Sequence, residues 1–597
     1  MTNKNYSFWR IFWPSLLAGV ALIILGFMFF TTIIGSIISG MTPKAPKESE
    51  MVLHLKLNQE VKEISSNDVT FDFSSIGVTQ TLGLADLLYG FEKAAEDDNV
   101  KGIFIELSGA NMGYSTATEL RNAIQKFEEN SGKFVVAYHS GEATSLMQYY
   151  IASGAGENYG FHSTSFEFLG LGAELMFFKG LFDKLDIEMQ VIRGKDNDFK
   201  SAVEPYFLTE MSDSSKLQME VYMNNLWTEI KNKISKDRGL SSGKLHNLAE
   251  SGAIRRMTNA LEHNLIDGLM YKDEVLQLLA DKIEAKDVED LNLKSFETYA
   301  KNKFYQQQNI VNAKNANVAV IVADGAITVD GDGIASNRLT KLIREARNDK
   351  HIKTIVLRVN SPGGSALASD EIWREVKLAN EEKQVVVSMG DVAASGGYYI
   401  AASAGTIFAQ ETTITGSIGV FGVIPFIGNT LENKLGITFD RIATNKYASA
   451  LSVNRKLNPE EFSIVQSEVD LIYDEFLQRV AEGRGMTKEQ VNVVARGRVW
   501  TGVDALEIGL VDQLGGINEA IEFAAKEAGI EEPIIKYYPK VKKEPWMEFV
   551  ELLNEEQNAS QQKNIKISQE FLSTLKKLKE LEDFVGIQAR LPYYIVW

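Results

Sequence analysis

The sequence predicts an α/β protein in which two similar domains follow one N-terminal transmembrane helix. Three observations lead to this prediction. Strand-like apolar runs alternate with amphipathic, helix-like segments, several blocks of sequence recur later in the chain, and residues 11–42 contain no charged side chain. A chain of 597 residues is also too long for a single hydrophobic core.

The N-terminal apolar segment, 11–42, exceeds the roughly 20 residues that a helix needs to cross a bilayer, so we expect a membrane anchor. A cleaved signal peptide is the alternative, because pairs of small residues stand at 35–36 and 39–40. Lys4 and Arg10 precede the apolar run, which favours a cytoplasmic segment 1–10 and an exported bulk.

The α/β prediction rests on alternating patterns in the region after the anchor. Residues 52–57, 102–107 and 134–139 are apolar runs typical of strands, and 115–129 has the apolar spacing of an amphipathic helix. Strands that alternate with helices in this way are typical of α/β domains.

The repeat is visible within the chain itself. Four pairs of blocks keep the same order, and the members of each pair are separated by 245 to 252 positions. The pairs are 100–103 with 352–355, 149–153 with 398–402, 181–187 with 431–437, and 260–267 with 505–512. We therefore expect two duplicated α/β domains, 51–305 and 316–540.

A C-terminal tail, 541–597, follows the second domain, and amphipathic helices are expected at 544–556 and 568–582. Its aromatic end, 593–597, could dock on the body of the protein or lie near the membrane.

Composition excludes several classes of function. The chain has no cysteine, which excludes a disulfide scaffold, a thiol nucleophile and thiolate metal sites. It carries 80 acidic against 62 basic side chains, a net charge of −18, which argues against a nucleic-acid partner.

Ser395 is the candidate nucleophile, because it lies between an apolar strand-like run, 384–389, and a helix-like segment, 400–404. A serine hydroxyl needs a base to take its proton and donors to stabilise the oxyanion that forms next. The N–H groups of a helix start could provide the donors, and Gly396 and Gly397 leave room for a substrate backbone to come close. A packing or capping serine is the alternative.

The repeat also helps to identify the residue that could act as general base for Ser395. Moving back 249 positions from Ser395 leads to Leu146, so only the second domain has the hydroxyl. None of the six histidines stands in a motif that suggests a catalytic triad. Lys200 is the candidate base, and its counterpart in the second domain is Ala448. Each domain would then hold one half of a Ser-Lys pair, unless Lys200 is simply a solvated lysine.

Two more segments fit a serine site. The turn 360–365 comes after a strand-like run, and Gly363 and Gly364 could expose N–H groups to a ligand. Its counterpart at 108–113 lacks the Pro-Gly-Gly sequence. The segment 415–420 includes Ser417, whose hydroxyl could bond a lysine amine.

Together, the motifs resemble those of the signal peptide peptidase A (protease IV) family, in its long, duplicated, membrane-anchored form, within the Clp protease/crotonase-like superfamily. The motifs that carry the resemblance are Lys200-Ser201-Ala202-Val203-Glu204-Pro205, Asn360-Ser361-Pro362-Gly363-Gly364-Ser365, Ala394-Ser395-Gly396-Gly397-Tyr398-Tyr399 and Gly416-Ser417-Ile418-Gly419-Val420. The resemblance implies that Ser395 is the nucleophile, Lys200 the general base, and Ser417 the residue that orients the lysine. It also implies an oxyanion hole formed by Gly396 with Gly363 or Gly364.

As a family property, the resemblance implies two tandem Clp/crotonase-like domains and a serine endopeptidase that degrades cleaved signal peptides at the membrane. It implies no metal or other cofactor, peptide substrates, a homotetramer, and a single-pass location in the inner membrane with the bulk on the periplasmic side. Two alternatives stay open at this point. One is a crotonase-like acyl-CoA enzyme, and the other is a membrane-anchored scaffold without catalysis.

Overall fold

The computed structural model describes residues 50–539, with gaps at 66–68, 73–74, 79–80, 314 and 332, together with a strand at Gly586–Arg590. The chain divides into two units, Met1–Met51 and Val52–Trp597, and the second unit contains both α/β repeats. The predicted N-terminal segment 1–10, the transmembrane helix at 11–42 and the tail helices at 544–556 and 568–582 lie outside the described residues. Within the described part, no helix is both long enough and apolar enough to span a membrane.

Two mainly parallel sheets confirm the α/β prediction, and their corresponding strands follow the same order. The first sheet runs β12 (Gly268–Leu269), β9 (Glu157–Gly160), β7 (Phe134–His139), β6 (Val100–Leu107), β1 (Met51–Leu57) and β13 (Leu293–Ser295). The second runs β24 (Gln513–Leu514), β20 (Thr406–Ala409), β19 (Val385–Ala394), β17 (Thr354–Ser361), β14 (Val318–Asp324) and β25 (Ile535–Tyr538). Two further strands, β21 (Ile414–Gly416) and β23 (Val499–Thr501), extend this sheet, with β21 pairing to β19. The shared order is the structural counterpart of the sequence repeat.

The central strands form where the sequence is apolar and β-branched. The predicted strands at 52–57, 102–107 and 134–139 correspond to β1, β6 and β7. Most of their residues are buried, as expected for parallel strands that are covered on both faces. The helix predicted at 115–129 lies within α3 (Tyr114–Ser131), which ends at Gly132 in the left-handed conformation, with φ 67°.

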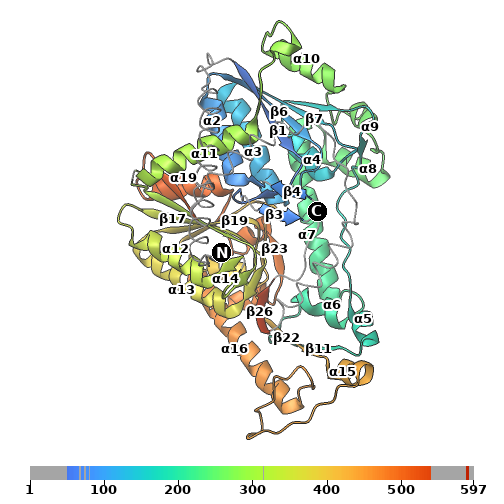
Figure 1. Ribbon diagram of the computed structural model, residues 1–597, viewed down its shortest axis with the longest axis vertical. Helices are drawn as coiled ribbons and strands as arrows, with labels where there is room; N and C mark the ends of the chain where they lie inside the picture. The colour runs from blue at the N-terminus through green and yellow to red at the C-terminus, as the bar shows by residue number, and fades with distance from the viewer. Residues whose placement is uncertain are drawn as a thin grey trace, which may run out of the picture. The chain divides into compact units, whose positions relative to one another are not determined.

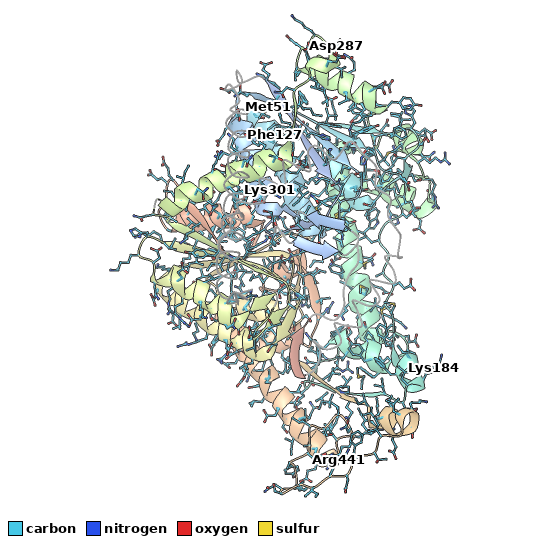
Figure 2. The ribbon with its side chains drawn as sticks, in the orientation of Figure 1. Met51, Phe127, Lys184, Asp287, Lys301 and Arg441 are labelled. Carbon is cyan, nitrogen blue, oxygen red and sulfur yellow. The ribbon has the colours of Figure 1, made fainter. Side chains whose placement is uncertain are left out.

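Helices cover the second sheet on both faces (Figure 1). α12 (Ser336–Asn348) and α13 (Ala366–Glu382) pack together on one side, and α19 (Ile517–Glu527) lies on the other against β17 and β19. α3 of the first repeat also contacts β19. α11 (Phe296–Ala313), which carries Lys301 in Figure 2, contacts both α2 (Leu84–Glu96) and β25. The two repeats therefore share packing surfaces.

A third sheet joins the repeats directly. Its order is β11 (Glu188–Arg193), β22 (Phe421–Phe426), β26 (Gly586–Arg590), β18 (Gly363–Ser365), β15 (Ile327–Thr328) and β16 (Ile334–Ala335). β11, from the first repeat, pairs antiparallel with β22 of the second over six residues. In the tail, for which we expected helices, the described part is a strand, β26. This sheet holds the segments next to Ser395 in place.

Candidate active site

Ser395 joins strand β19 to helix α14 (Gly396–Ala401), as predicted, but the helix begins at Gly396 rather than at residue 400. Its backbone has φ 58° and ψ −115°, a conformation that side-chain-bearing residues rarely adopt. The N–H of Ser395 donates to the Gly416 carbonyl at 2.8 Å, and its side chain makes no capping hydrogen bond. The Ser395 hydroxyl is therefore not used to cap the helix, and the interpretation of Ser395 as a capping residue is wrong.

Lys200 comes from the first repeat and meets Ser395 in the interior. It precedes a short 3-10 helix, η1 (Ser201–Val203), and neither Lys200 nor Ser395 has exposed surface. The Lys200 Nζ lies 2.7 Å from Ser395 Oγ, and 3.0 Å from both the carbonyl oxygen and the Oγ of Ser417. The structure brings these three residues together, and full burial excludes the solvated-lysine alternative.

Burial lowers the pKa of Lys200 well below the usual value for lysine. Glu204 is four residues away in the chain and fully buried, but its carboxylate turns from the amine. It accepts hydrogen bonds from the N–H and Oγ of Ser212, at 3.1 and 2.6 Å, and lies 3.8 Å from Arg193. An amine buried in this way is driven toward the neutral, basic form.

Ser417 fixes the direction in which that amine can act. Its Oγ donates to the Gly497 carbonyl at 3.2 Å, so it accepts from Lys200. A neutral lysine has two N–H groups, which the carbonyl oxygen and Oγ of Ser417 take up. The remaining lone pair then faces the hydroxyl of Ser395, 2.7 Å away.

The candidate oxyanion donors lie on two sides of the serine. Gly396 opens α14, where the first N–H groups have no partner within the helix. Gly363 and Gly364 form β18, and the N–H of Gly363 donates to Ser361 Oγ at 3.2 Å. A Cβ on Gly364 would lie 2.1 Å from the Ile327 carbonyl oxygen, so only glycine fits there.

Sequence reasoning missed Gly497, which lies against the lysine. Its φ is 79°, and a Cβ at this position would come 2.6 Å from the Cβ of Lys200 and 2.7 Å from its backbone nitrogen. The N–H of Phe199 donates to the carbonyl of the neighbouring Arg496 at 3.0 Å. The only sequence signal was a glycine between two arginines, which says nothing about Lys200.

A buried ion cluster was also missed. Arg358 on β17 donates to Glu63 at 2.9 Å and to Glu119 on α3 at 2.6 Å, and all three side chains are buried. Burial raises the pKa of Glu119 to about 7, opposed by the Arg358 charge. The cluster connects the first repeat to the strand of the second that leads into the Gly363–Gly364 turn.

Comparison with known proteins shows which families and relatives the chain resembles. Residues 128–286 and 377–531 match the family model of Peptidase family S49, and residues 314–414 match that of Clp protease. The chain is 32% identical to Protease 4 of Haemophilus influenzae over 84% of this chain and 83% of that protein. It is 34% identical to Protease 4 of Salmonella typhi over 77% and 74%.

A further relative comes from a plant. The chain is 33% identical to the chloroplastic serine protease SPPA of Arabidopsis thaliana, over 75% of this chain and 66% of the plant protein. The two Peptidase S49 matches fall in the first and second repeats respectively, so the duplication is present in the comparison as well.

Proposed function

The chain belongs to Peptidase family S49 and is a serine peptidase, and from this premise we propose that it is a membrane-anchored endopeptidase with a Ser395–Lys200 dyad. The observation that carries the dyad is the 2.7 Å contact between Lys200 Nζ and Ser395 Oγ, with both side chains fully buried. Membership of a peptidase family argues against the acyl-CoA enzyme and the inert scaffold.

The contacts around Ser395 supply a mechanism. Neutral Lys200 takes the proton of Ser395 while Oγ attacks the substrate carbonyl carbon, and the N–H of Gly396, with that of Gly363 or Gly364, stabilises the oxyanion. The Lys200 ammonium then returns the proton to the leaving amine as the peptide C–N bond breaks. Lys200 next takes a proton from a water molecule as the water oxygen attacks the acyl-enzyme, and it gives that proton to Ser395 Oγ as the ester C–O bond breaks. Ser417 holds the amine in place throughout, and no metal or cofactor is required.

The substrate and location are proposals of the same kind. The apolar segment 11–42 supports an anchor in the inner membrane, with the bulk of the chain on the periplasmic side. An enzyme anchored there is suited to cleaved signal peptides and other apolar peptides, in agreement with the motif resemblance. We also propose a homotetramer as the working assembly.

The dyad is tested with the full-length chain in detergent. We would compare wild type, Ser395→Ala, Lys200→Ala and the double variant in hydrolysis of an apolar peptide amide, and label each with a fluorophosphonate probe. Each single variant is expected to lose at least about 1,000-fold in kcat/KM, and the double variant little more, because members of a catalytic unit are non-additive.

Ser467→Ala is the matched control, since Ser467 lies on the exposed side of α16 (Pro459–Arg484), where its Oγ donates to the Ser463 carbonyl at 2.8 Å. Probe labelling that persists in Ser395→Ala, or losses that add in the double variant, would contradict the dyad.

A further inference from the structure

The first repeat has a pocket at the place that corresponds to the Ser395 site of the second repeat. Leu146, the counterpart of Ser395, lines this pocket and opens helix α4 (Leu146–Ala152). Part of the turn 108–113, the counterpart of 360–365, forms another wall. The pocket has a volume of about 180 Å³, and its walls also include Met112, Met147, Gly170, Leu171 and Met223. We call it the first-repeat pocket.

The groups that would make this pocket catalytic are missing. Leu146 has no hydroxyl, and the counterpart of Lys200 is Ala448, an exposed residue that precedes α16. In the second repeat the Lys200 amine lies 2.7 Å from Ser395 Oγ, whereas an alanine has no side chain long enough to fill the equivalent space. The first-repeat pocket therefore lacks the means to cut a peptide, but it is open to a ligand.

The backbone around the first-repeat pocket is free to pair with an extended chain. In the second repeat, β18 and β22 both pair with a strand that lies between them. Their counterparts, 111–113 and 172–177, pair with no described strand, and a single bridge joins Asn111 to Glu60. The backbone of 169–172 makes no hydrogen bond to any residue in the described part of the chain. Unpaired backbone of this kind is a template for a peptide strand.

The side chains of the first-repeat pocket favour apolar partners. Met112, Leu146 and Met147 are at most 7% exposed, and Met223 on α7 (Asp213–Arg238) is half-buried. Methionine is flexible and polarisable, so a pocket with several methionines accepts apolar side chains of different shapes. Its 180 Å³ is well below the roughly 300 Å³ of the smaller pockets that hold whole small molecules, so it suits one or two side chains of a peptide that lies across it.

The turn that lines the first-repeat pocket is bonded to the strand that leads to Ser395. Asp391 on β19 accepts hydrogen bonds from the N–H of Gly113 at 3.2 Å, and from the N–H and Oγ1 of Thr116 at 2.8 and 2.7 Å. Ser395 stands four residues after Asp391, at most about 14 Å along an extended chain. A peptide of about eight residues spans about 26 Å when extended, which is long enough to contact both places.

We propose that the first-repeat pocket binds, without cutting it, an apolar segment of the peptide whose scissile bond lies at Ser395. This inference rests on the peptidase function proposed above. The pocket adds affinity for long apolar peptides over short ones, because the second contact on the same peptide forms at a high effective concentration. The first repeat then has a second role besides supplying Lys200.

The test uses the full-length chain in detergent and two peptide amides with the same residues around the scissile bond. The short peptide has about four residues, and the extended peptide carries a further apolar run of about eight residues at either end. Met223→Glu puts a charge at the pocket, and Leu146→Phe fills it. Each variant is expected to lower kcat/KM for the extended peptide at least about tenfold relative to the short one, since burial of one apolar side chain contributes that much to binding. The change should fall on KM, because a contact remote from the reacting atoms holds substrate and transition state equally.

Leu217→Glu is the matched control, because Leu217 lies on the same helix as Met223, is 49% exposed and does not line the pocket. It is expected to keep the wild-type ratio of the two kcat/KM values. Turnover of the short peptide shows that each variant is folded.

Failure of the inference and failure of the proposed function give different results. If wild type is active, an unchanged ratio in both Met223→Glu and Leu146→Phe overturns the inference. A lower sedimentation coefficient of Met223→Glu would assign the pocket to a contact between copies of the chain and also overturn it.

If wild type cleaves neither peptide, the proposed function fails, and labelling decides the inference. The extended peptide, with a benzophenone group on one apolar residue, is then irradiated with the Ser395→Ala chain, and the adducts are mapped by mass spectrometry. Adducts are expected on Met112, Met147 or Met223. Adducts only outside the pocket, or equal labelling of these methionines by a benzophenone on an alkyl chain without peptide bonds, would overturn the peptide site.

Discussion

At the scale of single residues, the burial of Lys200 destabilises the folded protein but suits the catalytic role that we propose for it. Taking an ammonium group out of water is unfavourable, and burial is the cause that lowers its pKa. The hydrogen bonds to Ser417 offset part of this, but they do not replace a counter-charge. A residue of this kind is kept for what it does rather than for the stability it provides.

The pH dependence of stability tests this account. The folded pKa of Lys200 is lowered, so between that value and its unfolded value near 10.5 the unfolded chain binds more protons than the folded one. The free energy of unfolding of wild type should therefore rise with pH in that window, relative to Lys200→Met, by up to about 1.4 kcal/mol per pH unit. Urea denaturation of both proteins from pH 7 to 10 measures the difference.

Ser395→Ala is the control, because it leaves the lysine buried and should keep the wild-type slope. Peptidase activity should rise as the pH passes up through the lowered pKa of folded Lys200, where the amine loses its proton, and then stay level across the window. A wild-type stability curve parallel to that of Lys200→Met would mean that the amine is not buried in the folded protein.

At the scale of elements, the loop between α17 (Lys488–Val494) and β23 acts as a clamp on Lys200, the proposed base. Gly497 donates its N–H to the Ile418 carbonyl at 2.8 Å and accepts from Ser417 Oγ at 3.2 Å. It also lies directly against the backbone of Lys200. Both the lysine and the serine that orients it are thus positioned by a single turn.

Gly497→Ala should displace Lys200 while leaving Ser395 in place. The added Cβ meets backbone atoms at under 3 Å, and the positive φ strains any side chain. We expect kcat to fall about 100-fold with KM nearly unchanged, because a small misplacement of a catalytic group costs about that much. Gly485→Ala is the matched control, since Gly485 also has positive φ, 63°, but nothing within 4 Å of its Cβ position. Equal kcat values for the two variants would contradict the clamp.

The elements also show what sequence could and could not predict. The pairing of Ser395 with Lys200 was predictable because the repeat displayed what each half lacked, Leu146 in one and Ala448 in the other. The role of Gly497 was not predictable, because it depends on a missing side chain where Gly497 contacts the backbone of Lys200, which is distant in the sequence. Arg358 stands in an apolar strand with no local sign of its two carboxylate partners.

The start of α14 and the strand β26 were not predicted correctly from the sequence, for a related reason. The predicted start of α14 is four residues late, because Gly396 and Gly397 look like loop residues until the strained Ser395 turn is known. The alternation of apolar and polar residues in β26 covers only Ile587 to Arg590, too short a run to predict a strand, and its conformation depends on the two edges that it joins.

At the scale of the whole molecule, the contact between Lys200 and Ser395, and with it the proposed dyad, exists only while the two repeats stay docked. Arg358 of the second repeat pairs with both Glu63 and Glu119 of the first, so this buried cluster spans the contact between the repeats. Arg358→Leu leaves two buried carboxylates without their cation, so we expect a loss of about 3–5 kcal/mol in the free energy of unfolding. Adding Glu63→Gln and Glu119→Gln should recover much of the lost stability.

Arg374→Leu is the control, because Arg374 lies on the exposed side of α13, and it should change the free energy of unfolding by less than about 0.5 kcal/mol. An equally small effect of Arg358→Leu would contradict the role of the cluster.

The repeat also points to a contact that could build the homotetramer that we propose. Within one chain, β11 of the first repeat pairs with β22 of the second. The segment of the second repeat that corresponds to β11 is 438–443, and the segment of the first repeat that corresponds to β22 is 172–177. In the described part of the chain neither counterpart pairs with a strand. Ile192 on β11 is 1% exposed, whereas Ile442 is fully exposed. Arg441, beside it, lies on the connection between α15 (Gly428–Leu435) and α16, apart from the parallel sheets (Figure 2). We expect 438–443 of one copy to pair with 172–177 of the next, a head-to-tail contact that closes into a ring.

Ile442→Asp should therefore reduce the sedimentation coefficient of the full-length chain in detergent to that of a smaller species. Val493→Asp is the matched control, because Val493 is 80% exposed and belongs to α17 rather than to either segment. Since Ser395 and Lys200 meet within one chain, the dissociated Ile442→Asp variant should still be labelled by a fluorophosphonate. An assembly of unchanged size would contradict the strand contact, and loss of labelling on dissociation would mean that neighbouring copies hold the dyad together.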